Sequence, residues 1–207
     1  MWLKRKNRLH DYVPLVPPVQ KAPIDFTQAE TEAYFAWFMA HIDERAEYLR
    51  NRVARDLQIP IDELDFSIES LKPVWKWFLD VADFNRHLAR KFRSADAFTP
   101  VNSPLSVNSL CVIRDIGMYV GKTFTTQYPC LSWTVKTKPK NYISVNEPLL
   151  VGFVDADPSY PKPFYPDFEP LGAVYTLALG LFDQTARAND LYDLCVKFSG
   201  WVPFQSS

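Results

Sequence analysis

The sequence predicts a predominantly helical α+β protein, with about five helices packed in one domain and a small antiparallel β hairpin or sheet. Three observations favour this class. Hydrophobic residues make up 47% of the 207 residues, which is enough apolar side chain for a buried core in a chain of this length. Apolar residues recur at helical spacing through most of the chain. Between residues 131 and 154 the spacing changes to the alternation of a strand, so we expect the β element there.

The first 24 residues differ from the rest because they contain four prolines, at positions 14, 17, 18 and 23. Proline lacks an amide donor and biases the preceding residue toward an extended backbone. We therefore expect residues 1–24 to form an extended arm, either a docking segment of the fold or a segment that binds a partner. Residues 25–207 are expected to form the single globular domain.

Two helices are predicted in the first half of this domain. Thr27 and Glu30 have the spacing of a capping box, and apolar residues at helical spacing continue this helix from residue 27 to about residue 57. The second helix is expected to take Ser70 as its cap, because Pro73 then lies in the first turn, where its missing amide costs nothing. Its apolar positions continue to about Phe92.

A third helix is predicted from Ser103 as the cap, with Pro104 at the first helical position, to about Thr125. Within it, Gly117 and Gly121 lie one turn apart. Glycine inside a helix costs roughly 1 kcal/mol relative to alanine. The pair therefore indicates either a tight crossing with a neighbouring segment or the close approach of a ligand.

The β element is predicted after Pro129, where residues 131, 133 and 135 are apolar and residues 132, 134 and 136 are polar. The run from Lys138 to Asn141 has the composition of a turn, and the apolar run 149–154 is expected to pair back. Residues 155–170 combine five prolines with four aromatic residues, which predicts a packed loop. A fourth helix, capped by Asp167, is expected at about 168–183, and a fifth at about 189–199, ending at Gly200.

Charge and motifs argue against several classes of function. The net charge of -1 gives no field that would attract nucleic acid, and no apolar run reaches the roughly 20 residues of a membrane span. No glycine-rich phosphate loop, nucleophile elbow or zinc-binding pair of histidines occurs, so we expect no catalytic residue, metal or cofactor. Three cysteines without a C-x-x-C pair, and no signal peptide, favour reduced thiols in a cytoplasmic protein.

One polar group stands out in the third predicted helix. Arg114 and Asp115 interrupt an apolar stretch, and Tyr119 follows one turn later. Buried charges need partners that offset their desolvation. One interpretation is a structural ion pair with another helix or the sheet. The other is that Arg114, Asp115 and Tyr119 line a polar pocket, which would be the site of an enzyme that no motif marks.

Two charged segments are candidate partner-binding surfaces. The first is acidic, and the second combines lysines with aromatic side chains that suit an acidic surface or a phosphate. Each also has a purely structural interpretation: the acidic segment as a solvated approach to a helix, and the lysines as edge-strand charges that discourage aggregation. The candidate residues are Asp62, Glu63, Asp65 and Glu69 in the first segment, and Trp133, Lys136, Lys138, Lys140 and Tyr142 in the second.

Five runs in the sequence resemble an uncharacterised bacterial protein family of about 200 residues, which is similar to the immunity proteins of polymorphic toxins. These runs are Tyr34–Phe38, Phe66–Leu71, Arg114–Gly121, Thr137–Lys140 and Pro148–Phe153. The resemblance covers most of the chain and implies a small cytoplasmic protein that binds and neutralises a cognate toxin domain. It supplies no functional residues.

These observations together lead us to expect a non-catalytic binding protein of the immunity type, with a protein partner and with its oligomeric state left open. Two alternatives remain. One is the enzyme with a site around Arg114, Asp115 and Tyr119. The other is a scaffold protein, which would follow if the aromatic residues of the 155–170 loop form an exposed patch.

Overall fold

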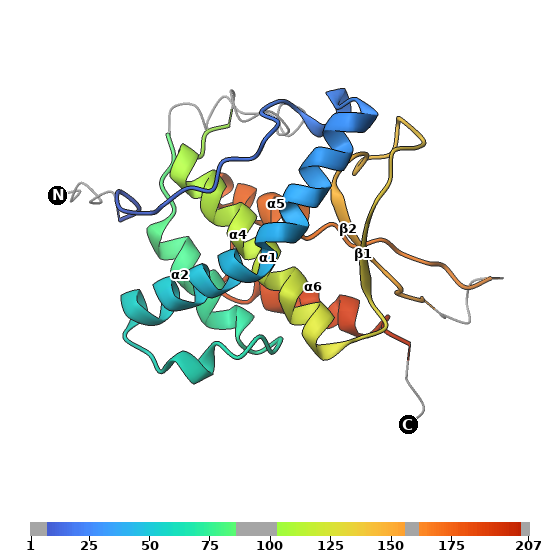
Figure 1. Ribbon diagram of the computed structural model, residues 1–207. Coiled ribbons are helices and arrows are strands. Elements are labelled where there is room, and N and C mark those ends of the chain that lie inside the picture. Colours follow the sequence, from blue (N-terminus) through green and yellow to red (C-terminus); the bar gives the residue numbers. More distant parts are fainter. Residues whose placement is uncertain (1–7, 86–102, 156–161, 204–207) are drawn as a thin grey trace.

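The computed structural model describes residues 8–85, 103–155 and 162–203, and it confirms the predominantly helical α+β class (Figure 1). The described residues form five α-helices, two short 3-10 helices and one two-stranded antiparallel sheet. The helices are α1 (Gln28–Leu57), α2 (Leu71–Val81), α4 (Val107–Gln127), α5 (Pro170–Asp183) and α6 (Asp190–Ser199); the 3-10 helices are η1 (Pro23–Asp25) and η2 (Ile61–Glu63); the strands are β1 (Ser132–Val135) and β2 (Pro148–Val151).

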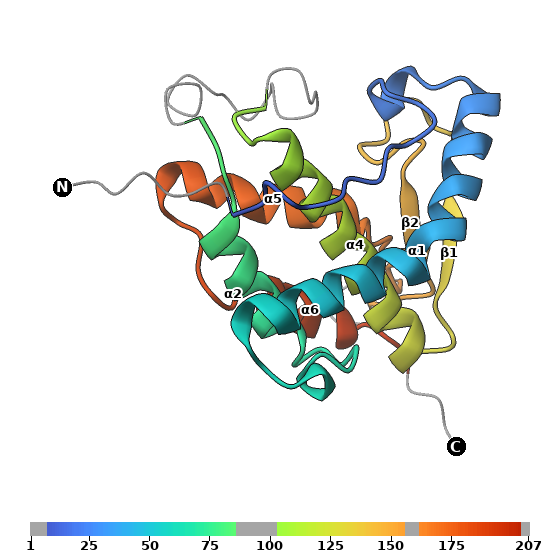
Figure 2. The same cartoon turned by 60° about the vertical axis from the view of Figure 1, so that its left-hand side comes forward.

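Helix α1 begins where the sequence predicted, because the capping box forms. The Glu30 amide donates to Thr27 Oγ1 at 3.3 Å, and the Thr27 amide donates to the Glu30 carboxylate at 2.7 Å. The helix ends at Leu57, because Gln58 takes the left-handed conformation with φ of 55°. Its buried side crosses α4, which places these two long helices at the centre of the molecule (Figure 2).

Helix α2 is shorter than predicted, since it ends at Val81 instead of near Phe92. The chain turns away because its next residues bond the first turn of α4 and the segment that precedes it. The Asp83 amide donates to Ser109 Oγ at 2.8 Å, and the Asn85 amide donates to the Pro104 carbonyl at 2.7 Å. The rest of the predicted helix, residues 86–92, lies outside the described residues.

The same contacts correct the start of the third predicted helix. Ser103 and Pro104 belong to the segment that pairs with residues 83–85, and the cap of α4 is Ser106, whose hydroxyl accepts from the Ser109 amide at 3.2 Å. Helix α4 is buried on most sides, because α1 packs on one side and α5 on another.

The two glycines of α4 allow close packing. A Cβ atom at Gly121 would lie 2.0 Å from Cζ2 of the Trp133 ring, and one at Gly117 would lie 3.0 Å from Cγ of Leu171 in α5. The missing side chains therefore let β1 and α5 approach the helix backbone.

In the sheet, Ser132 pairs with Val151 and Val135 pairs with Pro148, so both strands are shorter than the predicted alternation. The sheet packs on the helices through Trp133, whose ring lies edge-on to Phe38 of α1 at a centroid distance of 5.0 Å. Beyond the sheet, Phe153, Phe168 and Phe198 form an aromatic cluster that joins it to α6.

The cap of α5 is Glu169 and not Asp167 as predicted. The Glu169 carboxylate accepts from the Gly172 amide at 2.5 Å, and Pro170 occupies the first helical position. The Asp167 side chain is unavailable as a cap because it bonds Lys136 and Tyr142 instead. Helix α6 ends before Gly200, as the sequence predicted.

Residues 8–22 of the predicted arm run without helix or strand across α1 and α4 (Figure 1). Leu9 and Tyr12 are buried, whereas Val13 and Val16 are exposed. Helix side chains hold the arm by donating to its main-chain carbonyls: Arg52 to Arg8, Asn108 to Leu9, Arg45 to Val13 and Arg114 to Leu15, at 2.7–3.0 Å. Residues 1–7 lie outside the described part of the chain.

The predicted packed loop at 155–170 is packed only at its end. Phe168 is buried between β2 and α6, but Phe164 and Tyr165 are exposed. Residues 156–161, with Tyr160, are outside the described residues. Among the helices that are described, none combines the length and the apolar character needed to span a bilayer.

Candidate functional site

The three residues that the sequence grouped into one polar pocket, Arg114, Asp115 and Tyr119, do not meet. All three project from α4, but they point into different surroundings and bond different segments. Asp115 bonds α1 and the arm, Tyr119 bonds the start of α2, and Arg114 approaches the loop before β2.

Asp115 lies in a buried network with Arg45 and Tyr12. Arg45 Nε donates to Asp115 Oδ1 at 3.1 Å, and its Nη2 and the Tyr12 hydroxyl both donate to Oδ2. Arg45 is only 4% exposed and Asp115 only 1%. Both carboxylate oxygens accept hydrogen bonds, and the positive charge of Arg45 compensates the negative charge of Asp115.

Burial raises the pKa of Asp115, while the hydrogen bonds and the charge of Arg45 oppose that rise. Burial, followed by the negative charge of Asp115, raises the pKa of Tyr12 well above its usual value. The guanidinium of Arg45 also lies over the Tyr48 ring, 4.2 Å from its centroid. Sequence reasoning did not include Arg45, although it falls between Ile42 and Leu49 on the apolar side of α1, where a charge needs a partner.

Tyr119 serves a packing role between α4 and α2. Its hydroxyl lies 2.9 Å from that of Ser70, and its ring lies 4.8 Å from that of Phe66. Burial raises the pKa of Tyr119 to about 12, with the Ser70 hydrogen bond opposing the rise. A phenol in this state is a poor proton donor at neutral pH.

Arg114 joins a second polar group, which we name the Glu147–Glu169 cluster. Its members come from α1, α4, the loop before β2 and the cap of α5: Tyr34, Arg114, Ser144, Glu147 and Glu169. Arg114 Nη1 donates to the Leu15 carbonyl at 3.0 Å, and the guanidinium lies 5.8 Å from the centroid of the Trp37 ring. Its positive charge also acts on Glu147 and on Tyr34.

The two carboxylates of this cluster have unequal partners. Glu169 accepts hydrogen bonds from the Gly172 amide at 2.5 Å and from Ser144 Oγ at 3.3 Å. The Oε2 atom of Glu147 is buried, and no described residue donates a hydrogen bond to it. An acceptor in that position favours a protonated carboxyl group, because a buried and unpaired charge is costly.

Burial and the negative charge of Glu169 together raise the pKa of Glu147 to about 8, although the positive charge of Arg114 opposes the rise. Burial likewise raises the pKa of Glu169 to about 7, which the bonds from Gly172 and Ser144 oppose. Two neighbouring carboxylates in a dry site do not ionise together at neutral pH. The pair therefore retains a proton near pH 7 and can donate or accept one.

Sequence reasoning missed both glutamates of the cluster because they lie 22 positions apart in irregular segments. One signal was available: Glu169 directly precedes Pro170, and a capping acceptor followed by proline at the first helical position is typical of a helix start. No local pattern marks Glu147.

Metal-ligating side chains do not gather in the described residues, where no three His, Cys, Asp or Glu side chains are placed to hold an ion. The three cysteines are free; Cys111 and Cys195 are buried, whereas Cys130 is exposed. Burial raises the pKa of Cys111 and of Cys195, which makes both thiols less nucleophilic.

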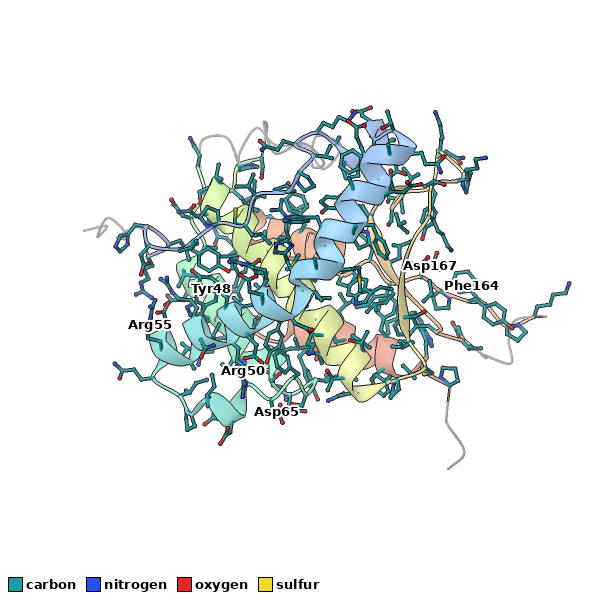
Figure 3. The ribbon with its side chains drawn as sticks, in the orientation of Figure 1. Tyr48, Arg50, Arg55, Asp65, Phe164 and Asp167 are labelled. Atoms are coloured by element: carbon teal, nitrogen blue, oxygen red, sulfur yellow. The ribbon has the colours of Figure 1, made fainter. Side chains whose placement is uncertain are left out.

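The predicted acidic segment forms the connection between α1 and α2. Buried Leu64 and Phe66 anchor it, and its carboxylates are exposed. Figure 3 labels one of them, Asp65. Two of them have local partners: Asp65 accepts from the Ser67 amide at 2.9 Å, and Glu69 pairs with Lys72 at 2.5 Å. Asp62 and Glu63 lie in η2 and remain exposed.

The predicted lysine-rich segment divides into two parts. Lys136 and Tyr142 both bond Asp167, and Trp133 packs against the helices. These three side chains therefore already make contacts within the protein, which leaves less of each for a partner. Lys138 and Lys140 are exposed in the loop that follows β1.

Next to the sheet, a projecting segment carries exposed aromatic side chains. Asp155 and Phe164 exchange backbone hydrogen bonds of 2.7 and 3.0 Å, which holds two extended stretches side by side. Phe164 lies well away from the helices, whereas Asp167 is close to β1 (Figure 3). Phe164 is 61% exposed and Tyr165 is 68% exposed.

No protein-family model, curated protein or solved structure matches this chain.

Proposed function

We propose that this protein is a non-catalytic, cytoplasmic binding protein of the immunity type, which binds and neutralises a cognate toxin domain. The observation that carries the binding proposal is the exposure of Phe164 and Tyr165 on the projecting segment. Large aromatic side chains are costly to leave in water and are the commonest anchors of protein interfaces. The same chain buries Trp75, Trp77 and Phe124 to 1% exposure or less.

Two surfaces of opposite charge add to this support. The acidic connection between α1 and α2 and the lysine-rich loop after β1 belong to different parts of the molecule (Figure 1). Complementary charge increases the rate and selectivity of protein association. The toxin as partner is supported by the resemblance to immunity proteins.

The non-catalytic part of the proposal is supported by the dispersal of Arg114, Asp115 and Tyr119. An enzyme built on these three side chains would need them around one cavity. Instead, Asp115 is fully bonded within the protein, and the Tyr119 hydroxyl is bonded to Ser70.

A co-expression experiment tests the proposal. The tagged protein is produced together with toxin domains encoded beside its gene, and growth and complex formation are measured. We expect protection from one toxin and a stoichiometric complex. The double variant Phe164→Ala/Tyr165→Ala should lose both without losing stability, whereas Val107→Ala, an exposed apolar residue at the far end of α4, should retain both. Absence of protection against every such toxin would contradict the proposal.

The exposed aromatic pair also favours a second candidate, a self-associating scaffold. The two candidates differ in oligomeric state, which light scattering of the purified protein measures over a series of dilutions. A concentration-dependent oligomer that Phe164→Ala/Tyr165→Ala dissolves would favour the scaffold. A monomer at all concentrations would favour the binding protein.

A further inference from the structure

The backbone hydrogen bonds of Leu150 determine which way the amides of β1 point. The Leu150 amide donates to the Phe168 carbonyl at 2.7 Å, and the Phe168 amide donates back at 2.9 Å. In a strand, the N–H and C=O of one residue point to the same side. Leu150 therefore directs both groups away from β1, and its register partner Trp133 shares no backbone hydrogen bond with it.

The alternation then continues along β1. Ser132 and Thr134 direct their amides toward β2, and the Lys136 carbonyl, on the same side, accepts from the Asn146 amide at 2.8 Å. Trp133 and Val135 direct theirs to the outside, where no backbone or side-chain group of the described residues bonds them.

Pro148 fits the same pattern. It lies opposite Val135, in a pair that shares no backbone hydrogen bonds, so its missing amide removes nothing from the β1–β2 ladder. The outer side of β1 is thus a strand edge on which two N–H groups and two C=O groups have no partner among the described residues. Figure 2 shows β1 at the rim of the molecule, with β2 on its inner side.

The surroundings of this edge are basic. Lys136 is paired with Asp167, so the uncompensated positive charge comes from Lys138 and Lys140, which are exposed and form no ion pair with a described residue. In the same loop, Ile143 is 81% exposed. An occupant that suits this edge is extended, negatively charged and apolar at alternate positions.

We propose that the outer edge of β1 binds an extended acidic segment of a protein partner, which adds to the sheet as a third strand beside Trp133 and Val135. This inference rests on the proposed binding function and assigns it a site and a partner chemistry. Strand addition supplies affinity through main-chain hydrogen bonds, and neighbouring side chains supply selectivity.

The competing interpretation is that the lysines keep foreign strands away from the edge. The two interpretations predict opposite results for an acidic strand, because Lys138 and Lys140 attract it in one case and the edge rejects it in the other. A defined peptide therefore separates them.

The probe is a short peptide of alternating glutamate and valine with both ends blocked. We expect it to slow hydrogen exchange at the amides of Trp133 and Val135, while a lysine–valine peptide has no effect. Val135→Pro removes one outward amide and should weaken binding about tenfold, the effect of one lost hydrogen bond. Its matched control, Val135→Ala, shortens the side chain, keeps the amide and should bind almost normally.

Because proline could disturb folding, the charge variant Lys138→Glu/Lys140→Glu provides a second measurement, with an expected loss of at least tenfold. The proposal is overturned if the acidic peptide protects neither amide, or if Val135→Pro and Val135→Ala bind it equally well. Because the peptide assay needs no toxin, its failure would remove strand addition and leave the proposed function in place. If no toxin is neutralised but the acidic peptide still binds, the proposed function fails and strand addition at β1 remains.

Discussion

Arg45 of α1 and Asp115 of α4, 70 positions apart in the sequence, form a buried ion pair that joins the two central helices. The Tyr12 hydroxyl donates to the same carboxylate, so the arm is attached at this point as well. One carboxylate therefore connects three segments of the chain.

We expect Asp115→Asn to destabilise the protein strongly, because the substitution keeps the shape but leaves the Arg45 charge buried without compensation. Removing one partner of a buried pair typically costs about 3–5 kcal/mol. Urea unfolding measures the change in the free energy of unfolding. The control is Glu69→Gln, which breaks the exposed pair with Lys72 and should cost at most about 1 kcal/mol. Equal costs for the two variants would contradict the structural role of Asp115.

The Glu147–Glu169 cluster predicts that stability falls as the pH rises. The pKa of Glu147 is raised by burial to about 8, above the ordinary value of 4.5 that the unfolded chain has. Between these values the unfolded chain loses its proton while the folded protein keeps it, so the free energy of unfolding decreases from about pH 5 to pH 8.

Glu147→Gln removes this titration. The variant should be more stable than the parent protein at pH 8, by roughly 1–3 kcal/mol, and should show a flatter pH profile. Denaturant unfolding at pH 5, 6.5 and 8 provides the comparison, and Glu44→Gln on the exposed side of α1 is the control. A parent protein with equal stability across this range would show that the carboxylates are not held in the protonated state.

Gly121→Ala should be destabilising even though alanine favours helices. The added Cβ would lie 2.0 Å from the Trp133 ring, which is held against Phe38 and cannot move freely. Small-to-large changes in a packed interior cost about 1–3 kcal/mol. Thermal unfolding should show a clear drop for this variant and little change for Gly200→Ala, where a new Cβ would lie 3.3 Å from the Lys197 carbonyl oxygen.

The thiols should react unequally. Cys130 is exposed, whereas Cys111 and Cys195 are buried, and burial raises the pKa of both. We expect a colorimetric thiol reagent to modify one thiol rapidly in the native protein and all three after denaturation. Cys130→Ser should abolish the fast phase; a fast phase that survives this change would mean that a buried thiol becomes accessible.

Much of the fold could be predicted because local chemistry determines it. The capping box of Thr27 and Glu30 fixes the start of α1, and Gly200 follows the end of α6 as expected. The errors occur where a distant segment competes for the same groups. Ser103 looks like a cap in the sequence, but its segment pairs with residues 83–85, and this pairing also ends α2 early. Asp167 looks like a cap, but Lys136 and Tyr142 hold its carboxylate.

The candidate site was less predictable for the same physical reason. The sequence showed that Asp115 would need a partner, but it did not show that Arg45 and Tyr12 supply the donors. Spacing along α4 suggested that Arg114, Asp115 and Tyr119 act together. Adjacent residues such as Arg114 and Asp115 point in different directions on a helix. Asp115 and Tyr119 lie one turn apart on the same face, but different segments cover the two turns, because Arg45 bonds Asp115 and Ser70 bonds Tyr119.

The way the arm is attached has a consequence for how the sequence can vary. Arg45, Arg52, Asn108 and Arg114 all bond main-chain carbonyls of residues 8–15, groups that every amino acid possesses. Leu9 and Tyr12 are buried, and the side chains of Arg8 and Asp11 form ion pairs with Asp80 and Arg52. The other residues of the arm can change their side chains without losing these main-chain hydrogen bonds. In diverging copies of this gene, we expect these other positions of the arm to vary, while the four helix residues that donate hydrogen bonds to the arm stay unchanged.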